Sequence, residues 1–114
     1  MSTASAWSVA LNGIEGAMVE VEVAEGGGLP RTVLVGLPDA ALSQAKERVR
    51  AAVTGAELPW PSGLVTINLS PANLPKTGTH YDLAIATAAL AAIDKVPKDA
   101  ARNHVCLGEL GLDG

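Results

Sequence analysis

The segment VTINLSPANLPKTGTHYDLAIA, residues 65–86, carries the strongest structural signal in the chain. Val65, Ile67 and Leu69 alternate with polar residues, the period of two that a strand with one buried face requires. Pro71 and Pro75 then end the strand, because proline lacks a backbone donor and disfavours the helical basin for the residue before it. An apolar run follows this stiff loop, so we expect a helix over residues 79–94. Function should sit in the loop between them.

The expected helix over residues 79–94 is apolar almost all round, which predicts a central, buried position. Six alanines would let its neighbours approach closely. Thr79, followed three residues later by Asp82, is a weak capping pattern for its start. After Pro97 the sequence predicts a short helical or irregular stretch, then a strand over residues 104–107. The Asp113-Gly114 pair is a hairpin signal, so we expect the first arm of a hairpin before it.

Upstream of residue 65 the patterns predict three strands and one helix. Strands are expected over residues 7–11, 17–24 and 32–35, the second with alternating valines and glutamates. A helix is expected over residues 38–53, closed by Gly55, with one apolar stripe formed by Leu42, Ala45, Val49, Ala52 and Val53. The order of three strands, helix, strand, helix and strand indicates one α+β domain.

Composition narrows the function classes. The chain has 114 residues, a net charge of −4 and a pI near 5.0, which argues against the whole surface acting as a nucleic-acid clamp. Cys106 stands in an apolar run and cannot form an internal disulfide, which indicates a packing role and a reducing compartment, by default the cytoplasm. No secretory signal is visible, and the longest apolar run, residues 83–93, is too short to span a bilayer, so we expect no membrane association.

Several short motifs compete for a chemical interpretation. Ser43 to Lys46 spells S-x-x-K and Lys76 to Gly78 spells K-T-G, two signatures of penicillin-binding serine enzymes, although the third is missing and the separation is too short. LPKTG at residues 74–78 matches a sortase sorting signal, but no membrane span follows it. No Walker-type phosphate loop occurs, so the fragment itself predicts no cofactor. His80 and His104 have no further ligand at metal-binding spacing, so no metal site is expected.

Four blocks of sequence stand in order along nearly the whole chain. They are ALNGIEG at 10–16, VGLPDAALSQAKERVRAAV at 35–53, INLSPANLPKTGTHYDLAIA at 67–86 and LGELGLDG at 107–114. Together they resemble the N-terminal Lon-protease-like domain of the Mg-chelatase-like AAA+ ATPases, the competence-associated ComM or YifB-type family. The resemblance implies the fold of ribosomal protein S5 domain 2, a mostly antiparallel sheet with two main helices packed on one face. It also implies that residues 1–114 are one domain ahead of an AAA+ domain that the chain does not contain.

The resemblance also bears on catalysis. The Lon-type active-site loop reads roughly Pro-Lys-Asp-Gly-Pro-Ser-Ala-Gly, and Pro75, Lys76 and Gly78 match it. His80 stands at the position of the nucleophilic serine, and an imidazole cannot form the ester intermediate that serine forms. We therefore expect no catalytic residue and a proteolytically inactive module. The alternatives are a peptidase that uses Thr79 or another nucleophile, and a literal magnesium-chelatase subunit.

For the longer protein the resemblance implies ATP and Mg²⁺ bound by the AAA+ domain, a homo-hexameric ring, and DNA as the substrate of recombination. A related Lon-like domain in RadA recombination proteins contributes to ring assembly and DNA contact. Five basic residues are the candidate contacts with a neighbouring subunit or DNA: Arg31, Lys46, Arg48, Arg50 and Lys76. A simpler interpretation is that the helical ones form a solvated face.

Overall fold

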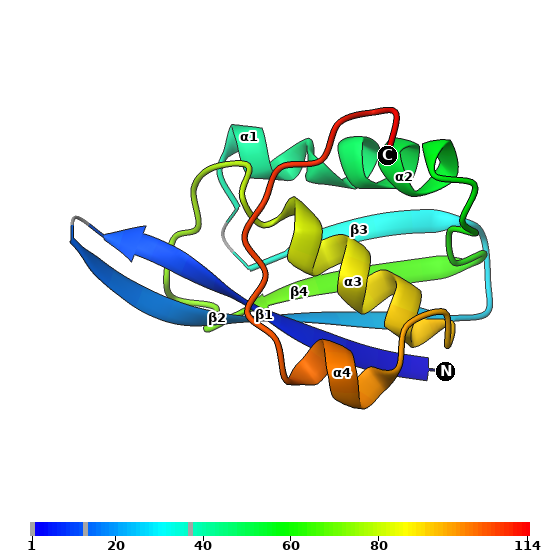
Figure 1. Cartoon of the computed structure of the whole chain (residues 1–114), viewed down its shortest axis with the longest axis horizontal. Helices are drawn as coiled ribbons and strands as arrows, with labels where there is room; N and C mark the ends of the chain where they lie inside the picture. The colour runs from blue at the N-terminus through cyan, green and yellow to red at the C-terminus, as the bar shows by residue number, and fades with distance from the viewer. Residues whose placement is uncertain (1, 13, 37) are drawn as a thin grey trace.

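A computed structural model describes residues 2–12, 14–36 and 38–114. Its centre is a mixed sheet with the strand order β1-β2-β4-β3 (Figure 1). The four strands of the described residues are β1 (Ser2–Asn12), β2 (Glu15–Gly26), β3 (Arg31–Val35) and β4 (Leu64–Ser70). β2 pairs antiparallel with β1 and β4, and the edge strand β3 runs parallel to β4. The expected α+β class is confirmed, with a mixed sheet in which antiparallel pairing dominates.

Register follows from the alternation of apolar residues. Val21 lies opposite Ala6 of β1 on one side and Leu69 of β4 on the other, and all three are buried. A slip of one residue would turn this apolar row to solvent, so burial specifies the pairing.

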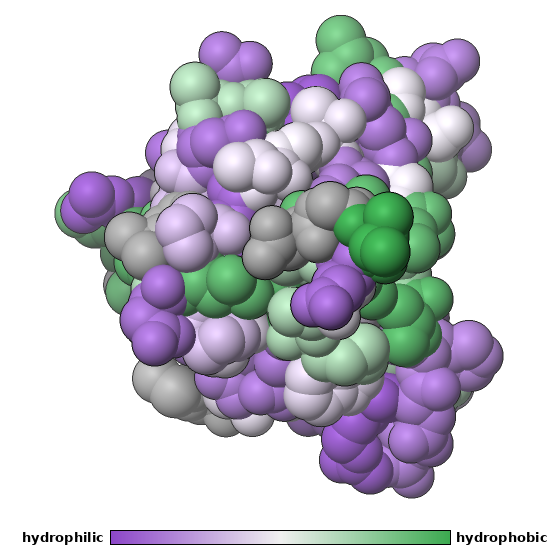
Figure 2. Space-filling view, turned by 90° about the vertical axis from the view of Figure 1, so that its left-hand side faces the viewer, coloured by the Kyte–Doolittle hydropathy of each residue, from purple (hydrophilic) through white to green (hydrophobic). Residues whose placement is uncertain are grey.

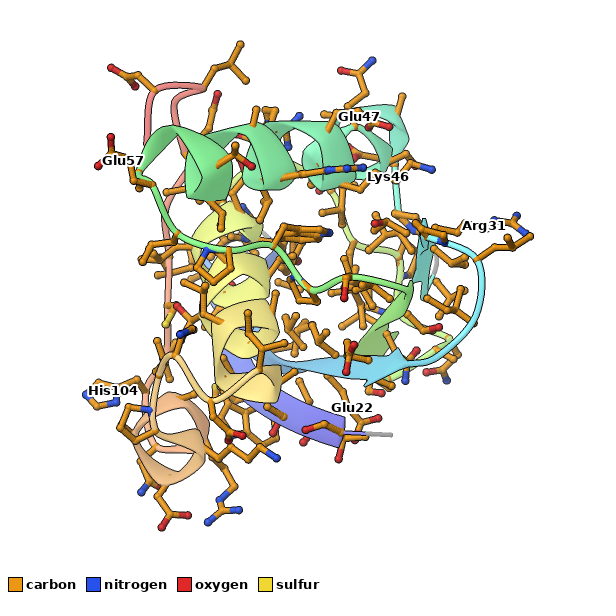
Figure 3. The ribbon with its side chains drawn as sticks, turned by 90° about the vertical axis from the view of Figure 1, so that its right-hand side faces the viewer. Glu22, Arg31, Lys46, Glu47, Glu57 and His104 are labelled. Atoms are coloured by element: carbon orange, nitrogen blue, oxygen red, sulfur yellow. The ribbon has the colours of Figure 1, made fainter. Side chains whose placement is uncertain are left out.

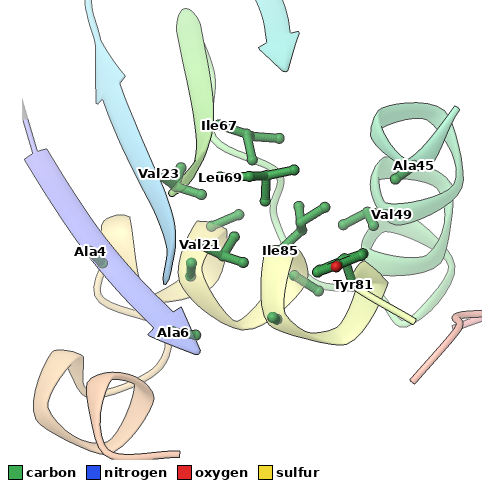
Figure 4. Packing of buried hydrophobic residues seen from close by; sticks show 14 of the residues in the cluster. Ala4, Ala6, Val21, Val23, Ala45, Val49, Ile67, Leu69, Tyr81 and Ile85 are labelled. Atoms are coloured by element: carbon green, nitrogen blue, oxygen red, sulfur yellow. The ribbon is translucent and has the colours of Figure 1, made fainter. Parts of the chain in front are cut away.

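The helices in the described part of the chain are α1 (Ala40–Ser43), α2 (Ala45–Gly55), α3 (Asp82–Ala92) and α4 (Lys98–Arg102). Helix α3 contacts β1 and β2, α2 contacts α3 and β3, and α4 contacts β1 and α3. Figure 4 shows α3 between the strands and α2, with side chains from all three layers meeting around Ile85. As the sequence predicted, α3 is the central helix, and its six alanines are all buried. None of the helices in the described residues is long and apolar enough to cross a bilayer.

The expected helix over residues 38–53 is divided in two, with Gln44 between α1 and α2. Arg48 explains the break, because its Nη1 donates to the carbonyl of Ala41 at 2.9 Å. In a continuous helix this carbonyl would accept from the N–H of Ala45. The apolar stripe predicted a helix correctly but could not reveal that a side chain replaces one of its backbone bonds.

Two other expectations were wrong in detail. Helix α3 begins at Asp82, and the hydroxyl of Thr79, expected near its start, donates to Glu109 at 2.7 Å. Residues 104–107 form no strand, because only Val105 bridges the edge of β1, at Trp7. The chain then turns toward α3, where the N–H of Leu83 donates to the carbonyl of Gly108 at 3.0 Å.

The first strand is longer than the expected residues 7–11, because β1 and β2 form a long hairpin that extends past β4 (Figure 1). Glu15 to Val19 pair with β1 but have no partner in β4. Toward the turn the hairpin exposes Leu11, Ile14 and Met18, whereas Val19 and Val21 are buried. The side of the molecule in Figure 2 shows hydrophobic surface interspersed with hydrophilic residues.

Candidate functional site

We call the segment of residues 71–81, between β4 and α3, the anchored loop. Lys76 lies at its centre and is fully buried, although sequence reasoning placed it among the surface contacts. Its Nζ donates to the carbonyl of Pro71, a residue of the same loop. Burial lowers the pKa of Lys76, because a desolvated ammonium is less favourable than a neutral amine. The side chain therefore braces the loop from inside and is not available to a partner at the surface of this structure.

Asp39 fastens the anchored loop to the start of α1. Its Oδ1 accepts from the N–H of Leu42 at 2.7 Å, a helix N-cap bond. Its Oδ2 accepts from the N–H of Gly78 at 3.1 Å, and its own N–H donates to the carbonyl of Lys76 at 2.9 Å. Gly78 has a φ of 101°, which only glycine adopts at little cost. One carboxylate therefore holds two segments that are far apart in the sequence.

Asp82 closes the other end of the loop. Its two carboxylate oxygens accept from Nε and Nη2 of Arg48, both at 2.9 Å, and Oδ2 also accepts from the N–H of Leu110 at 3.2 Å. The Asp82 side chain is fully buried and that of Arg48 is 17% exposed. The hydrogen bond with Asp82 raises the pKa of Arg48 further. Arg48 is thus a structural partner of α3, and sequence reasoning missed this because the two residues are 34 positions apart.

His80 is bound on both its side chain and its backbone. Its Nε2 lies 2.7 Å from the carbonyl of Val9, an acceptor, so this nitrogen carries the proton in the bond. Its own carbonyl accepts from the N–H of Gly108 at 2.9 Å. The imidazole also lies against the ring of Tyr81, with ring centroids 4.2 Å apart. His80 therefore links β1, the anchored loop and the C-terminal segment.

Two buried hydroxyl groups have no hydrogen-bond partner among the described residues. They are the Tyr81 hydroxyl and Ser8 Oγ, and both residues are fully buried. Burial, followed by the negative charge of Asp39, raises the pKa of Tyr81. The alternative nucleophile, Thr79, donates its hydroxyl to a carboxylate of Glu109. Ser43 and Lys46 of the S-x-x-K pattern lie in different helices, so the shared helical face that this pattern would need is not formed.

Three of the five candidate basic residues come together at a second place, between β3 and α2. One hollow, of about 160 Å³, is lined by Thr32, Lys46, Glu47 and Arg50. The next, of about 210 Å³, shares Thr32 and Arg50 and adds Arg31, Trp60 and their neighbours in sequence. Figure 3 shows Arg31 and Lys46 on the same side of the molecule, with Glu47 nearby. We call the two hollows together the basic groove; it is lined by Pro30, Arg31, Thr32, Lys46, Glu47, Arg50, Trp60, Pro61, Ser62 and Gly63.

The described part of the chain contains no group of three or more His, Cys, Asp and Glu side chains placed to hold a metal ion. His80 is engaged with Val9, and Nδ1 of His104 lies 2.5 Å from the carbonyl of Ala100. The geometry thus presents two sites of different kinds: an anchored loop closed by internal bonds and an open basic groove.

These features define an α+β domain with a mixed sheet, a buried alanine-rich helix and a strand-loop-helix unit braced by a buried lysine. The chain belongs to the family described as subunit ChlI of Mg-chelatase, whose family model matches residues 19–114. This agrees with the Mg-chelatase-like family that the four sequence blocks indicated.

Individual relatives match over most or all of the chain. The chain is 50% identical over all 114 residues to the uncharacterized protein Rv2897c of Mycobacterium tuberculosis, covering 23% of that protein. It is 39% identical over its whole length to the competence protein ComM of Haemophilus influenzae, covering 22% of it. It is also 40% identical over 102 residues to YifB of Escherichia coli, covering 20% of that protein. The chain therefore spans less than a quarter of the length of these relatives.

Proposed function

We propose that this chain is the non-proteolytic, Lon-like N-terminal module of a longer Mg-chelatase-like AAA+ ATPase of the ComM type. In this proposal it supports assembly of a homo-hexameric ring and guides DNA during recombination or natural transformation. ATP and Mg²⁺ bind to the AAA+ domain, and the protein works in the cytoplasm. The name of the Haemophilus relative, a competence protein, supports the link to DNA uptake.

The observation that carries the non-proteolytic part is the bonding of His80. This residue stands where a Lon-type loop has its serine, and its imidazole is held by the carbonyl of Val9 at 2.7 Å. A nucleophile in an acyl-transfer site must reach the carbonyl carbon of a substrate and be activated by a base. An imidazole bonded to the backbone of β1 serves instead to fasten that strand to the anchored loop.

The S5 domain 2-like fold is part of the same proposal. Its support is the order of elements and the placement of α2 and α3 above one mostly antiparallel sheet. The anchored loop would then be a former active-site loop whose strand-to-helix geometry is retained for assembly. Function must be argued from such a site and not from the fold alone.

A peptidase assay tests the non-proteolytic part. We expect no turnover of fluorogenic peptides or unfolded casein by the wild-type chain, or by the protein extended through its AAA+ domain. His80→Ser restores the hydroxyl at the loop position, and His80→Ala is its matched control, because both lose the bond to Val9. Turnover by the wild-type protein that Thr79→Val abolishes would contradict the proposal and establish a peptidase.

A second assay tests the role in assembly. The extended protein with ATP should form a hexamer by mass photometry, and removal of residues 1–114 should weaken that hexamer. A deletion that leaves hexamer formation and DNA binding unchanged would remove both roles from this domain.

The family description itself favours a second candidate, a subunit of a magnesium chelatase. That function predicts ATP-dependent insertion of Mg²⁺ into a porphyrin when the other chelatase subunits are supplied. Porphyrin metallation followed by absorbance, with and without this protein, separates the two candidates.

A further inference from the structure

We infer that the basic groove binds a single-stranded segment of nucleic acid, with phosphates at Arg31, Lys46 and Arg50 and one base against the indole of Trp60. This inference rests on the proposed function, because it names the surface by which the domain guides DNA. Arg48 and Lys76 have no part in it, since the first is bound to Asp82 and the second is buried.

The groove is held open by backbone structure. Lys46 and Arg50 are one turn apart on α2, so their side chains leave the same helical face. On the opposite wall, the N–H of Arg31 donates to the carbonyl of Gly63 at 3.1 Å, which fastens β3 to the segment that carries Trp60. One wall is therefore a helix and the other a strand with the segment bonded to it, so a ligand would meet a site that needs little rearrangement.

The charge of the groove opposes the charge of the chain. Three cations line it against one carboxylate, that of Glu47, whereas the whole chain carries −4. Within the described residues, Arg31, Lys46 and Arg50 form no ion pair, while the other two arginines, Arg48 and Arg102, pair with aspartates. Unpaired cations around a hollow attract phosphate groups and release the counterions of the nucleic acid.

The aromatic residue decides between kinds of ligand. Trp60 is partly buried, packs against the core and lines the larger hollow, with prolines on both sides in sequence. An indole held in this way can stack with an unpaired base, the combination of cation and aromatic that binds single strands. Bases inside a duplex are stacked on each other and do not reach an indole. An acidic peptide would use the cations but would gain nothing from stacking.

The fluorescence of Trp60 provides the test. The chain has two tryptophans, so Trp7→Phe leaves Trp60 as the reporter. Titration of this variant with an oligothymidylate of about twelve nucleotides should quench the emission to saturation. Three phosphate contacts predict a slope of about −2 for log K against log salt. A duplex of the same length and polyglutamate, tested as rival ligands, should bind more weakly and leave the emission nearly unchanged.

Variants in the groove should separate charge from stacking. Arg31→Glu, Lys46→Glu and Arg50→Glu should each weaken binding and reduce the salt slope by about 0.7. Trp60→Leu removes the reporter, so its binding is followed by the fluorescence anisotropy of a labelled oligothymidylate. Binding should weaken by about five- to 150-fold and the slope should stay unchanged, with the melting temperature measured to confirm folding. Lys95→Glu is the matched control, because Lys95 is exposed and lines neither hollow. This substitution changes the net charge by the same amount as each groove variant.

Three results would overturn the inference: no saturable quenching at low salt, equal quenching by the duplex or polyglutamate, or equal weakening by Lys95→Glu and the groove variants. If all groove variants still bind the oligonucleotide, the basic groove is not the binding site, and the proposed function is unaffected. Failure of the proposed function would show instead in the hexamer and peptidase assays.

Discussion

The anchored loop and the basic groove use charged residues in opposite ways. Asp39 and Asp82 fasten the loop from outside it and each accept two or more hydrogen bonds, and Arg48 is bound to Asp82. In the groove, Lys46 and Arg50 line open hollows and form no ion pair within the described chain. Charged side chains whose hydrogen bonds and ion pairs are formed within the protein stabilise a fold, whereas charged side chains without such partners at a concave surface can bind a ligand. The comparison therefore separates residues that hold the domain together from residues that meet a partner.

The largest effect should come from Asp82→Ala. The substitution leaves the Arg48 guanidinium, whose side chain is 17% exposed, without its carboxylate and frees the N–H of Leu110. Breaking a buried pair on one side costs about 3–5 kcal/mol, measured as the free energy of unfolding in urea. Asp99→Ala is the control, because its pair with Arg102 is exposed and should contribute about 0–1 kcal/mol. Equal losses would mean that the loop pair is no stronger than a surface pair.

A somewhat smaller loss should follow Gly36→Ala, directly after β3. Gly36 has a φ of 113°, and an added Cβ would lie 2.3 Å from the carbonyl oxygen of Leu69. Strained backbone of this kind costs about 1–3 kcal/mol, to be measured by thermal unfolding. Gly27→Ala serves as the control, because nothing lies within 4 Å of its added Cβ. Retained stability in Gly36→Ala would show that the close approach of Gly36 to Leu69 does not constrain the fold.

Lys76→Met should change the pH dependence of stability. Burial lowers the pKa of folded Lys76 below the ordinary lysine value of 10.5, so the unfolded chain binds more protons than the folded chain as pH approaches that value. Stability contributed by this group therefore rises with pH up to about 10.5 and is constant above it. The rise should be absent in Lys76→Met, measured as the difference in unfolding free energy between the two proteins across alkaline pH. Parallel curves would indicate that the ammonium is not desolvated in the fold.

The smallest effect on stability should come from the groove. Arg50→Glu and Lys46→Glu change exposed or partly exposed side chains that form no ion pair within the described residues, so each should alter the free energy of unfolding by about 0.5 kcal/mol or less. Thermal unfolding of both variants and of Asp82→Ala under the same conditions would compare the loss of stability in the groove with that at the anchored loop. A loss of several kcal/mol in the groove would mean that it is a structural element like the anchored loop.

Local patterns were enough to predict much of the fold. Three features could be predicted from short stretches of sequence: the alternation in β2 and β4, the apolar run of α3, and the turns at proline and glycine. Each depends on residues only a few positions apart that share one face of an element. The same reasoning failed at Gln44, where Arg48 replaces a backbone bond, and at residues 104–107, where a single bridge stands in place of a strand. The bridge joins Trp7 to Val105 across most of the chain, and the break at Gln44 involves a side chain seven residues from the carbonyl that it binds, so the local apolar pattern reveals neither contact.

The candidate site divides along the same line. The sequence by itself determined the α+β class, the strand-loop-helix unit, the imidazole at position 80 and the set of basic residues, since these depend on residue type and short-range order. Tertiary structure alone decided that Lys76 is buried and that Arg48 pairs with Asp82. It also decided that Lys46 and Arg31 line adjoining hollows that share Arg50, the larger of them lined by Trp60 as well. Burial and pairing depend on which distant segments pack together, and a linear pattern does not contain that information.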